Sequence, residues 1–299
     1  MKKSFDTYLY EQAYAKSTIN TYLIYHDKFI KWCESKDYDP YTIDYKTCLL
    51  YAKKLQRPVK GKRPSKKSTK IGIGALKIFF KYLIEENHRG DNPMENMNIR
   101  GAKRTLNHNL LEYEELEDLF YSFPTQNIEL PNSPSVAIRD KVITGFMVYQ
   151  GLSITSIKHL KIQHVNLERG NIYVPSTLKT NYRKLEIKSP QVLSLAQYIQ
   201  NDREVLQNAI ACHTEAFIPQ NSDRFTVACQ LFKKLRNINL NIKNAHQIRA
   251  SIITHWLKLY NIREVQYMAG HRYISSTERF LQDDIENLQE MIDNLHPIN

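Results

Sequence analysis

The sequence predicts a mainly helical protein with one small β-sheet, divided into two domains. Its 299 residues are 42% apolar, which is more than one small module needs and enough to bury sizeable cores. Apolar residues recur every three or four positions over 17–36, 41–56 and from about 68 to 84, as on one face of a helix. The runs NIYVP at 171–175 and RKLEIKS at 183–189 have the composition of strands, and the segment STLKTNY between them predicts a β-hairpin.

The domain boundary is predicted where the helical periodicity stops. The helix-breaking run RGDNP at 89–93 ends the first helical region, and residues 94–110 show little apolar periodicity. We therefore expect a first domain at 1–98, a linker at 99–109 and a second domain at 110–299.

The starts of several helices can also be predicted. Ser17 has the short polar side chain of an N-cap residue. In the second domain, LLEYEELEDLF from Leu110 and the segment 136–150 have helical periodicity, and the second of these ends at Gly151. Helical patterns resume after the hairpin and continue to the C-terminus.

Positive charge dominates the chain and gathers in one segment. Lys and Arg number 42 against 31 Asp and Glu, a formal charge of +11 that favours an anionic partner such as nucleic acid. In residues 53–70, here named the basic loop, nine of eighteen positions are basic and none is acidic. One interpretation is a solvated turn, and the other is contact with a phosphate backbone. The predicted DNA contacts are Lys60, Lys62, Arg63, Lys66, Lys67 and Lys70.

The composition excludes other classes. No apolar run has signal-peptide length or reaches the roughly 18 uninterrupted residues of a membrane span, so we expect a cytoplasmic protein without a membrane partner. The four cysteines lie far apart without a C-x-x-C pair, which predicts reduced, mostly buried thiols and no metal site. They are Cys33, Cys48, Cys212 and Cys229.

Residues 245–280 carry the densest candidate chemistry. His246 and Arg249 are three residues apart on a predicted helix, so both side chains project from one face and could donate to one phosphate. The spacing alone also fits a capping histidine and a surface arginine.

Six segments, in order along nearly the whole chain, resemble the tyrosine recombinase (phage integrase) family. They are STINTYLIYHDKFIKWC, STKIGIGALKIFFKYLIEENHRGDNP, YQGLSITSIKHLKIQHVNLERGNIYV, STLKTNYRKLEI, HQIRASIITHWL and AGHRYISSTERF. The resemblance implies a helical core-binding (SAM-like) domain and a catalytic domain that form a C-shaped clamp around duplex DNA. In the family, a tyrosine attacks a backbone phosphate and leaves a 3′-phosphotyrosine, with no metal, ATP or other cofactor.

The same resemblance implies the partners and the setting. We expect paired duplex DNA recombination sites as partners, bound by a homotetramer. An accessory DNA-bending protein is a further possible partner. The expected setting is the prokaryotic cytoplasm, associated with the nucleoid, and the expected source is a mobile element. Integration, excision and inversion all remain open.

Four family positions are filled. Lys179 matches the hairpin lysine that protonates the leaving oxygen, His246 and Arg249 match the H-x-x-R pair, and His271 of AGH matches the His/Trp position. Fixed Arg and His donors suit the negative charge that gathers on a pentacoordinate phosphorane.

Two departures from the family concern charge. Ser153 stands at the position of the first arginine, and Ser156 stands at the position of a nearby glutamate. A hydroxyl can bond a phosphate oxygen but brings no charge. Arg139, Lys158 or Arg183 could supply the missing cation.

A third departure concerns the nucleophile. Phe280 stands nine residues after His271, where the family has its tyrosine, so covalent cleavage is expected to be blocked while fold and DNA binding survive. Tyr267 and Tyr273 do not have the family spacing. Either Phe280 is an engineered replacement in a recombinase, or the chain is a naturally inactive DNA-binding relative that acts as a regulator or synaptic-complex partner. Whether the chain is an enzyme therefore stays open.

The C-terminal segment predicts an amphipathic helix. Its apolar positions are Ile285, Leu288, Met291, Ile292 and Leu295. This face could pack on its own domain, or it could dock into a neighbouring subunit as in the family. The core-binding resemblance disfavours an RNA-binding or topoisomerase-like protein.

Overall fold

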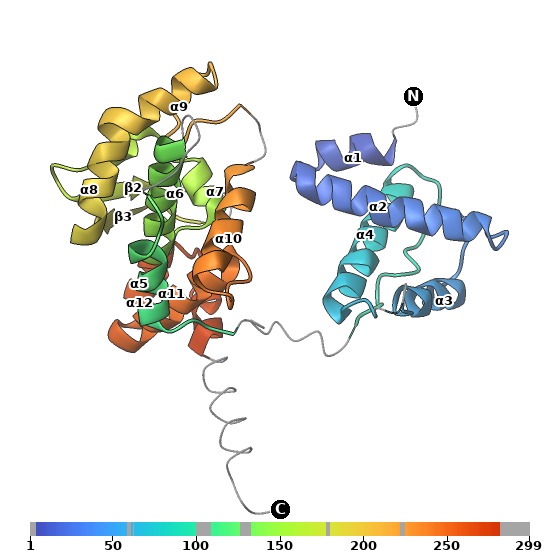
Figure 1. Ribbon diagram of the computed structural model, residues 1–299. Coiled ribbons are helices and arrows are strands. Elements are labelled where there is room, and N and C mark those ends of the chain that lie inside the picture. The colour runs from blue at the N-terminus through green and yellow to red at the C-terminus, as the bar shows by residue number, and fades with distance from the viewer. Residues whose placement is uncertain are drawn as a thin grey trace, which may run out of the picture. The chain divides into compact units, whose positions relative to one another are not determined.

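The chain forms two compact units, residues 1–104 and 105–299, each with its own hydrophobic core. The computed structural model describes residues 4–58, 61, 63–99, 109–125, 133–177, 180–221 and 225–281 (Figure 1). Helices dominate both units, and a three-stranded sheet lies in the second, which confirms the predicted fold class. Three predicted contacts, Lys60, Lys62 and Lys179, lie outside the described residues, as does the amphipathic helix over 285–295.

The first unit contains four helices among its described residues. They are α1 (Phe5–Glu11), α2 (Lys16–Glu34), α3 (Tyr45–Leu55) and α4 (Lys66–Glu85). Side chains of Ser4, Asp44 and Ser65 cap α1, α3 and α4 by accepting backbone N–H bonds. The prediction of Ser17 as an N-cap is wrong, because α2 begins one residue earlier, after Ala15 in an extended conformation. The seven-residue α1 is too short for apolar periodicity to reveal it.

The core of the first unit lies where α2 packs on α4. Phe29 of α2 and Phe80 of α4 are fully buried, with ring centroids 5.8 Å apart and nearly perpendicular planes. Gly72 lets α4 approach α2, because a Cβ at this position would lie 2.8 Å from the ring of Tyr25. The hydroxyl of Tyr25 donates to the Ser68 carbonyl across 3.1 Å, so the ring is held in place.

The second unit begins with helices, continues into the sheet and ends with helices. Before the sheet come α5 (Tyr113–Tyr121), α6 (Ser133–Val148), α7 (Ile154–Lys158) and the 3-10 turn η1 (Ile162–His164). The strands are β1 (Val165–Asn166), β2 (Asn171–Val174) and β3 (Arg183–Glu186). After them come α8 (Ser189–Gln197), the π-helical turn η2 (Tyr198–Asp202), α9 (Arg203–Ala209), α10 (Val227–Ile238), α11 (Ala245–Leu259) and α12 (Ile262–Ala269). Residues 275–281 are also helical.

The sheet is antiparallel in the order β1-β2-β3. Ile172 pairs with Leu185, and Val174 pairs with Arg183. All four side chains are buried, whereas Tyr173 and Lys184 between them are exposed, as the two-residue period of a strand requires. Arg183 therefore occupies an inward position that an apolar residue would ordinarily fill.

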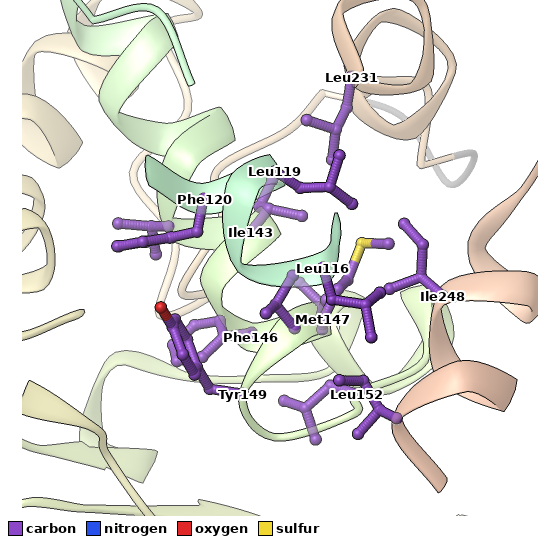
Figure 2. Packing of buried hydrophobic residues seen from close by; sticks show 14 of the residues in the cluster. Leu116, Leu119, Phe120, Ile143, Phe146, Met147, Tyr149, Leu152, Leu231 and Ile248 are labelled. Carbon is purple, nitrogen blue, oxygen red and sulfur yellow. The ribbon is translucent and has the colours of Figure 1, made fainter. Parts of the chain in front are cut away.

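The core of the second unit surrounds α6. Figure 2 shows Leu116 and Leu119 of α5 beside Met147 of α6, with Ile248 of α11 facing them. On the polar side of α6, the fully buried carboxylate of Asp140 accepts from Arg139 and from Lys234. A buried carboxylate that bonds two cations is satisfied.

Two further expectations concern composition. Cys33 and Cys48 are buried, but Cys212 is half-buried and Cys229 is exposed, so the prediction of mostly buried thiols holds for two of four. Within the described ranges, no helix is long and apolar enough to span a membrane, and no group of three metal-binding side chains occurs.

The two glycines inside α4 give a matched test of the first core. A Cβ at Gly74 meets nothing within 4 Å, so Gly74→Ala is expected to stabilise the chain by about 0.5–1 kcal/mol through helix propensity. Gly72→Ala is expected to destabilise it by roughly 1–3 kcal/mol, because the Tyr25 ring must move. Urea unfolding of both variants measures this, and equal effects of the two would contradict the close approach of α4 to α2.

Candidate active site

The centre of the site is the guanidinium of Arg249 on α11. Its Nη1 donates to the carbonyl of Gly151, and its Nη2 donates to the carbonyl of Ala269 across 2.6 Å. Among the described residues no carboxylate bonds this side chain. Burial lowers the pKa of Arg249 to about 10, so the group stays charged at pH 7. The two carbonyls orient the guanidinium without neutralising it.

His271 lies beside Arg249, directly after Gly270, which ends α12 in the left-handed conformation. Its Nδ1 is 2.9 Å from Oγ1 of Thr277, and its Nε2 is 3.5 Å from Nη2 of Arg249. Because a guanidinium can only donate, Nε2 accepts and the ring proton sits on Nδ1. Burial, followed by the charges of Arg249, Arg183 and Arg279, lowers the pKa of His271 to about 4. The imidazole is therefore neutral at pH 7.

Arg183 on β3 is the second guanidinium near His271. Its side chain is fully buried, and only Nη1 has a partner, the Asn181 carbonyl at 3.5 Å. Its Nε and Nη2 have none. Burial and the nearby charge of Arg249 lower its pKa to about 9. The site thus holds two guanidinium groups that repel each other.

The hairpin end is attached to the turn that carries His271. The Asn181 N–H donates to the Gly270 carbonyl across 2.9 Å, and Thr180 forms an antiparallel bridge with His271. A Cβ at Gly270 would overlap Nη1 of Arg183, and its φ of +69° also favours glycine. Gly270 therefore provides the space that the buried arginine occupies.

Phe280 lies in the same cluster. Its ring stacks on the imidazole of His271, with centroids 6.0 Å apart and planes 13° from parallel. The helical segment 275–281 thus places the Phe280 side chain next to His271 of the same chain. Tyr273 is 71% exposed, and the hydroxyl of Tyr267 accepts from the Lys184 backbone N–H, so neither tyrosine takes this place.

Ser153 and Ser156 are occupied in capping α7. Oγ of Ser153 accepts from the Ser156 N–H at 3.0 Å and lies 2.9 Å from Oγ of Ser156. This pair is a helix start. The Ser153 hydroxyl therefore serves local structure.

The other residues predicted from the sequence, Arg139, Lys158 and His246, lie in different surroundings. Arg139 donates through Nε and Nη2 to Asp140, so it belongs to the buried ion pair of α6. Lys158 lies half-buried at the end of α7, and His246 is exposed one turn before Arg249. Arg183 is close enough to the site for the charge of Arg249 to lower its pKa and for its own charge to lower the pKa of His271.

Sequence reasoning missed Arg279, and it gave Arg183 no preference over Arg139 and Lys158. A signal for Arg183 exists in RKLEI, where strand alternation puts residues 183, 185 and 187 on one buried face. An arginine on the apolar face of a predicted strand indicates a special role.

The site's composition agrees with a family comparison. Residues 109–287 match the family model described as the phage integrase family. The chain belongs to the phage integrase family. Among curated relatives of this integrase-family chain, tyrosine recombinase XerA of Pyrococcus furiosus is 26% identical over 298 residues, covering 97% of the chain and 92% of the relative. Tyrosine recombinase XerC of Escherichia coli O127:H6 is 23% identical over 236 residues, covering 77% and 74%.

Solved structures share the fold of this integrase-family chain. XerH site-specific recombinase bound to palindromic difH substrate, in a post-cleavage complex, has a TM-score of 0.70 at 21% identity, covering 91% of this chain and 78% of that one. The Tn1549 transposon integrase in complex with transposon right-end DNA has a TM-score of 0.61 at 14% identity, covering 96% and 97%.

The lowered pKa of His271 predicts a pH dependence of stability. Between pH 6.5 and 4 the unfolded chain binds a proton at residue 271 that the folded chain does not, so stability falls as pH falls through this window. His271→Gln removes this titration. We expect the parent's free energy of unfolding to fall more steeply than the variant's, by at most about 1.4 kcal/mol per pH unit. Urea unfolding across the window measures both slopes, and parallel slopes would contradict a neutral His271.

Proposed function

We propose that this chain is a tyrosine recombinase that binds paired duplex DNA sites in site-specific recombination and cannot cut them as it stands. One observation carries the proposal. Arg249 and His271 form a half-buried cationic site without a bonded carboxylate among the described residues, and the ring of Phe280 stacks on the imidazole of His271. Because no described carboxylate neutralises this charge, an anionic partner such as the DNA backbone suits the site.

The proposed chemistry is transfer of a backbone phosphate to a tyrosine at position 280. Arg249 donates to the phosphate oxygens as negative charge gathers on them. As the tyrosine oxygen bonds to phosphorus, the neutral imidazole of His271, which Thr277 orients, accepts the tyrosine proton. The bond from phosphorus to the 5′ oxygen breaks, and Lys179 gives that oxygen a proton; His246, at the exposed start of α11, donates to the phosphate. The proposed reaction uses no metal and no nucleotide cofactor.

The proposed assembly follows the family. Unit 1–104 serves as the core-binding domain and unit 105–299 as the catalytic domain, and each binds the DNA. Four copies act on two paired sites of a mobile element, in the cytoplasm at the nucleoid. The C-terminal segment from 282 onward links neighbouring copies.

Phe280 also favours a second candidate function, DNA binding without cleavage. A phenyl ring keeps the apolar contact of tyrosine but has no oxygen to attack phosphorus. The charge of Arg249 and the neutral His271 favour a site kept for chemistry. Ser153, which caps a helix, favours a relative that regulates or completes a synaptic complex.

Restoring the hydroxyl separates the two functions. In Phe280→Tyr we expect a covalent protein–DNA adduct, because the new oxygen extends from a ring already stacked on His271. The measurement is a denaturing gel with nicked suicide duplexes that contain a sequence selected by the parent chain from a random pool.

Two controls define the outcome of the cleavage test. The double variant Phe280→Tyr/Tyr273→Phe should still form the adduct, which excludes the exposed Tyr273 as its source. Tight binding by the parent chain and Phe280→Tyr, with no adduct from either, would refute the recombinase and support the DNA-binding relative.

The basic loop and the start of α4 are the proposed contact with the DNA backbone in the first unit. Arg63, Lys66, Lys67 and Lys70 are all exposed. Two of these lysines lie in the first turn of α4, which contains no acidic residue. Cations are unfavourable there because a helix N-terminus is itself positive. An anionic partner offsets that cost.

Paired lysine variants test this contact. Lys66→Ala with Lys67→Ala should weaken duplex binding and lower the slope of log affinity against log salt by about 1.8, the value for two lost phosphate contacts. The matched control, Lys31→Ala with Lys36→Ala, removes the same charge from exposed positions at and after the C-terminal end of α2. Fluorescence anisotropy over a salt series measures both, and equal slopes in the two double variants would refute the contact.

A further inference from the structure

Arg183 differs from the other buried arginines in how its donors are used. Arg89 and Arg203 each leave one buried nitrogen unpaired. However, Arg89 bonds Asp91, and Arg203 bonds the carbonyls of Thr214 and Ala216. Arg183 leaves both Nε and Nη2 unpaired and has a single long bond, to a carbonyl. In a fully buried side chain, this leaves a charge without compensation.

The residues around Arg183 leave room for its side chain but do not neutralise its charge. Gly270 has no Cβ where Nη1 of Arg183 lies, and the strand gives the arginine an inward position between buried apolar residues. A second guanidinium, that of Arg249, adds repulsion. Unpaired buried charge beside like charge destabilises a fold, and proteins keep such features at functional sites.

We propose that Arg183 is the second guanidinium of the phosphate site and supplies the charge that Ser153 lacks. Its ligand is a phosphodiester of the DNA backbone, which accepts from Nε and Nη2 of Arg183 and from Arg249. The inference rests on the proposed function and names the residue that completes its site.

Access to Arg183 depends on the hairpin end. The hydrogen bond from the Asn181 N–H to the Gly270 carbonyl, which forms part of the Thr180–His271 bridge, holds this end against the His271 turn. Arg183 adds its 3.5 Å bond to Asn181. In the proposed complex these contacts part, and a phosphate that also bonds Arg249 replaces the weak carbonyl bond of Arg183 with charge-assisted hydrogen bonds.

Stability gives the first test, because charge and packing predict opposite signs. Arg183→Met keeps the length and the apolar contacts but removes the charge. We expect its melting temperature to equal or exceed that of the parent, since an unpaired buried charge is removed. A lower melting temperature, or failure to fold, would show that Arg183 is structural and would overturn the inference.

Binding gives the second test, with an exposed arginine as the control. Anisotropy with a duplex selected by the parent chain should show binding weakened roughly ten-fold or more in Arg183→Met. Its salt slope should fall by about 0.9, the value for one phosphate contact. Arg183→Lys, which keeps the charge, should recover part of the affinity. Arg169→Met removes an exposed charge from the turn before β2 and should change neither quantity. Unchanged binding by Arg183→Met would overturn the inference.

Inorganic phosphate separates this inference from the proposed function. We expect phosphate to raise the melting temperature of the parent and of Arg169→Met, but not that of Arg183→Met. If phosphate raises these melting temperatures as expected but the parent binds no duplex tightly, the proposed DNA function is wrong while the anion site at Arg183 is supported. Equal phosphate effects in all three proteins would overturn the site.

Discussion

Arg249 must keep its charge inside the second unit without a carboxylate beside it. It does so by donating to two backbone carbonyls, those of Gly151 and Ala269, which bring the ends of α6 and α12 to α11. The approach of Gly151 is close, because a Cβ there would lie 3.0 Å from Trp256 of α11. Carbonyl dipoles orient the guanidinium but leave its net charge unpaired. We propose that the partner of this charge is an anion.

Ser153 and Arg183 differ in what they supply. The hydroxyl of Ser153 caps α7, whereas Arg183 of β3 lies on the buried face of the sheet, and we propose that it brings the second positive charge to the site. Burial, followed by the charges of Arg249 and Arg183, lowers the pKa of His271 and keeps it neutral near pH 7, and its Nδ1 lies 2.9 Å from Oγ1 of Thr277. Phe280 keeps an apolar ring against this imidazole. Because a phenyl ring has no nucleophilic oxygen, the proposed site can bind a phosphate without cleaving it.

Much of the fold could be predicted because periodicity reports burial. The long helices α2 and α4, the hairpin strands and the H-x-x-R helix all follow from apolar spacing. The start of α2 could not be predicted, because Ala15 enters the helix without a capping side chain. Arg183 was one of three candidates, since its proximity to Arg249 depends on how a strand and two helices meet. The stacking of Phe280 on His271 depends in the same way on a turn at Gly270.

Arg249 and Arg183 are proposed to share one backbone phosphate beside Phe280. A structure of this chain bound to an intact duplex would show this contact, because the phenyl ring leaves the phosphodiester uncut. We expect one phosphate within hydrogen-bond distance of both Arg249 and Arg183, with the edge of the Phe280 ring facing its phosphorus atom. A bound duplex whose phosphates contact surface lysines alone, with Arg183 still on the Asn181 carbonyl, would contradict it.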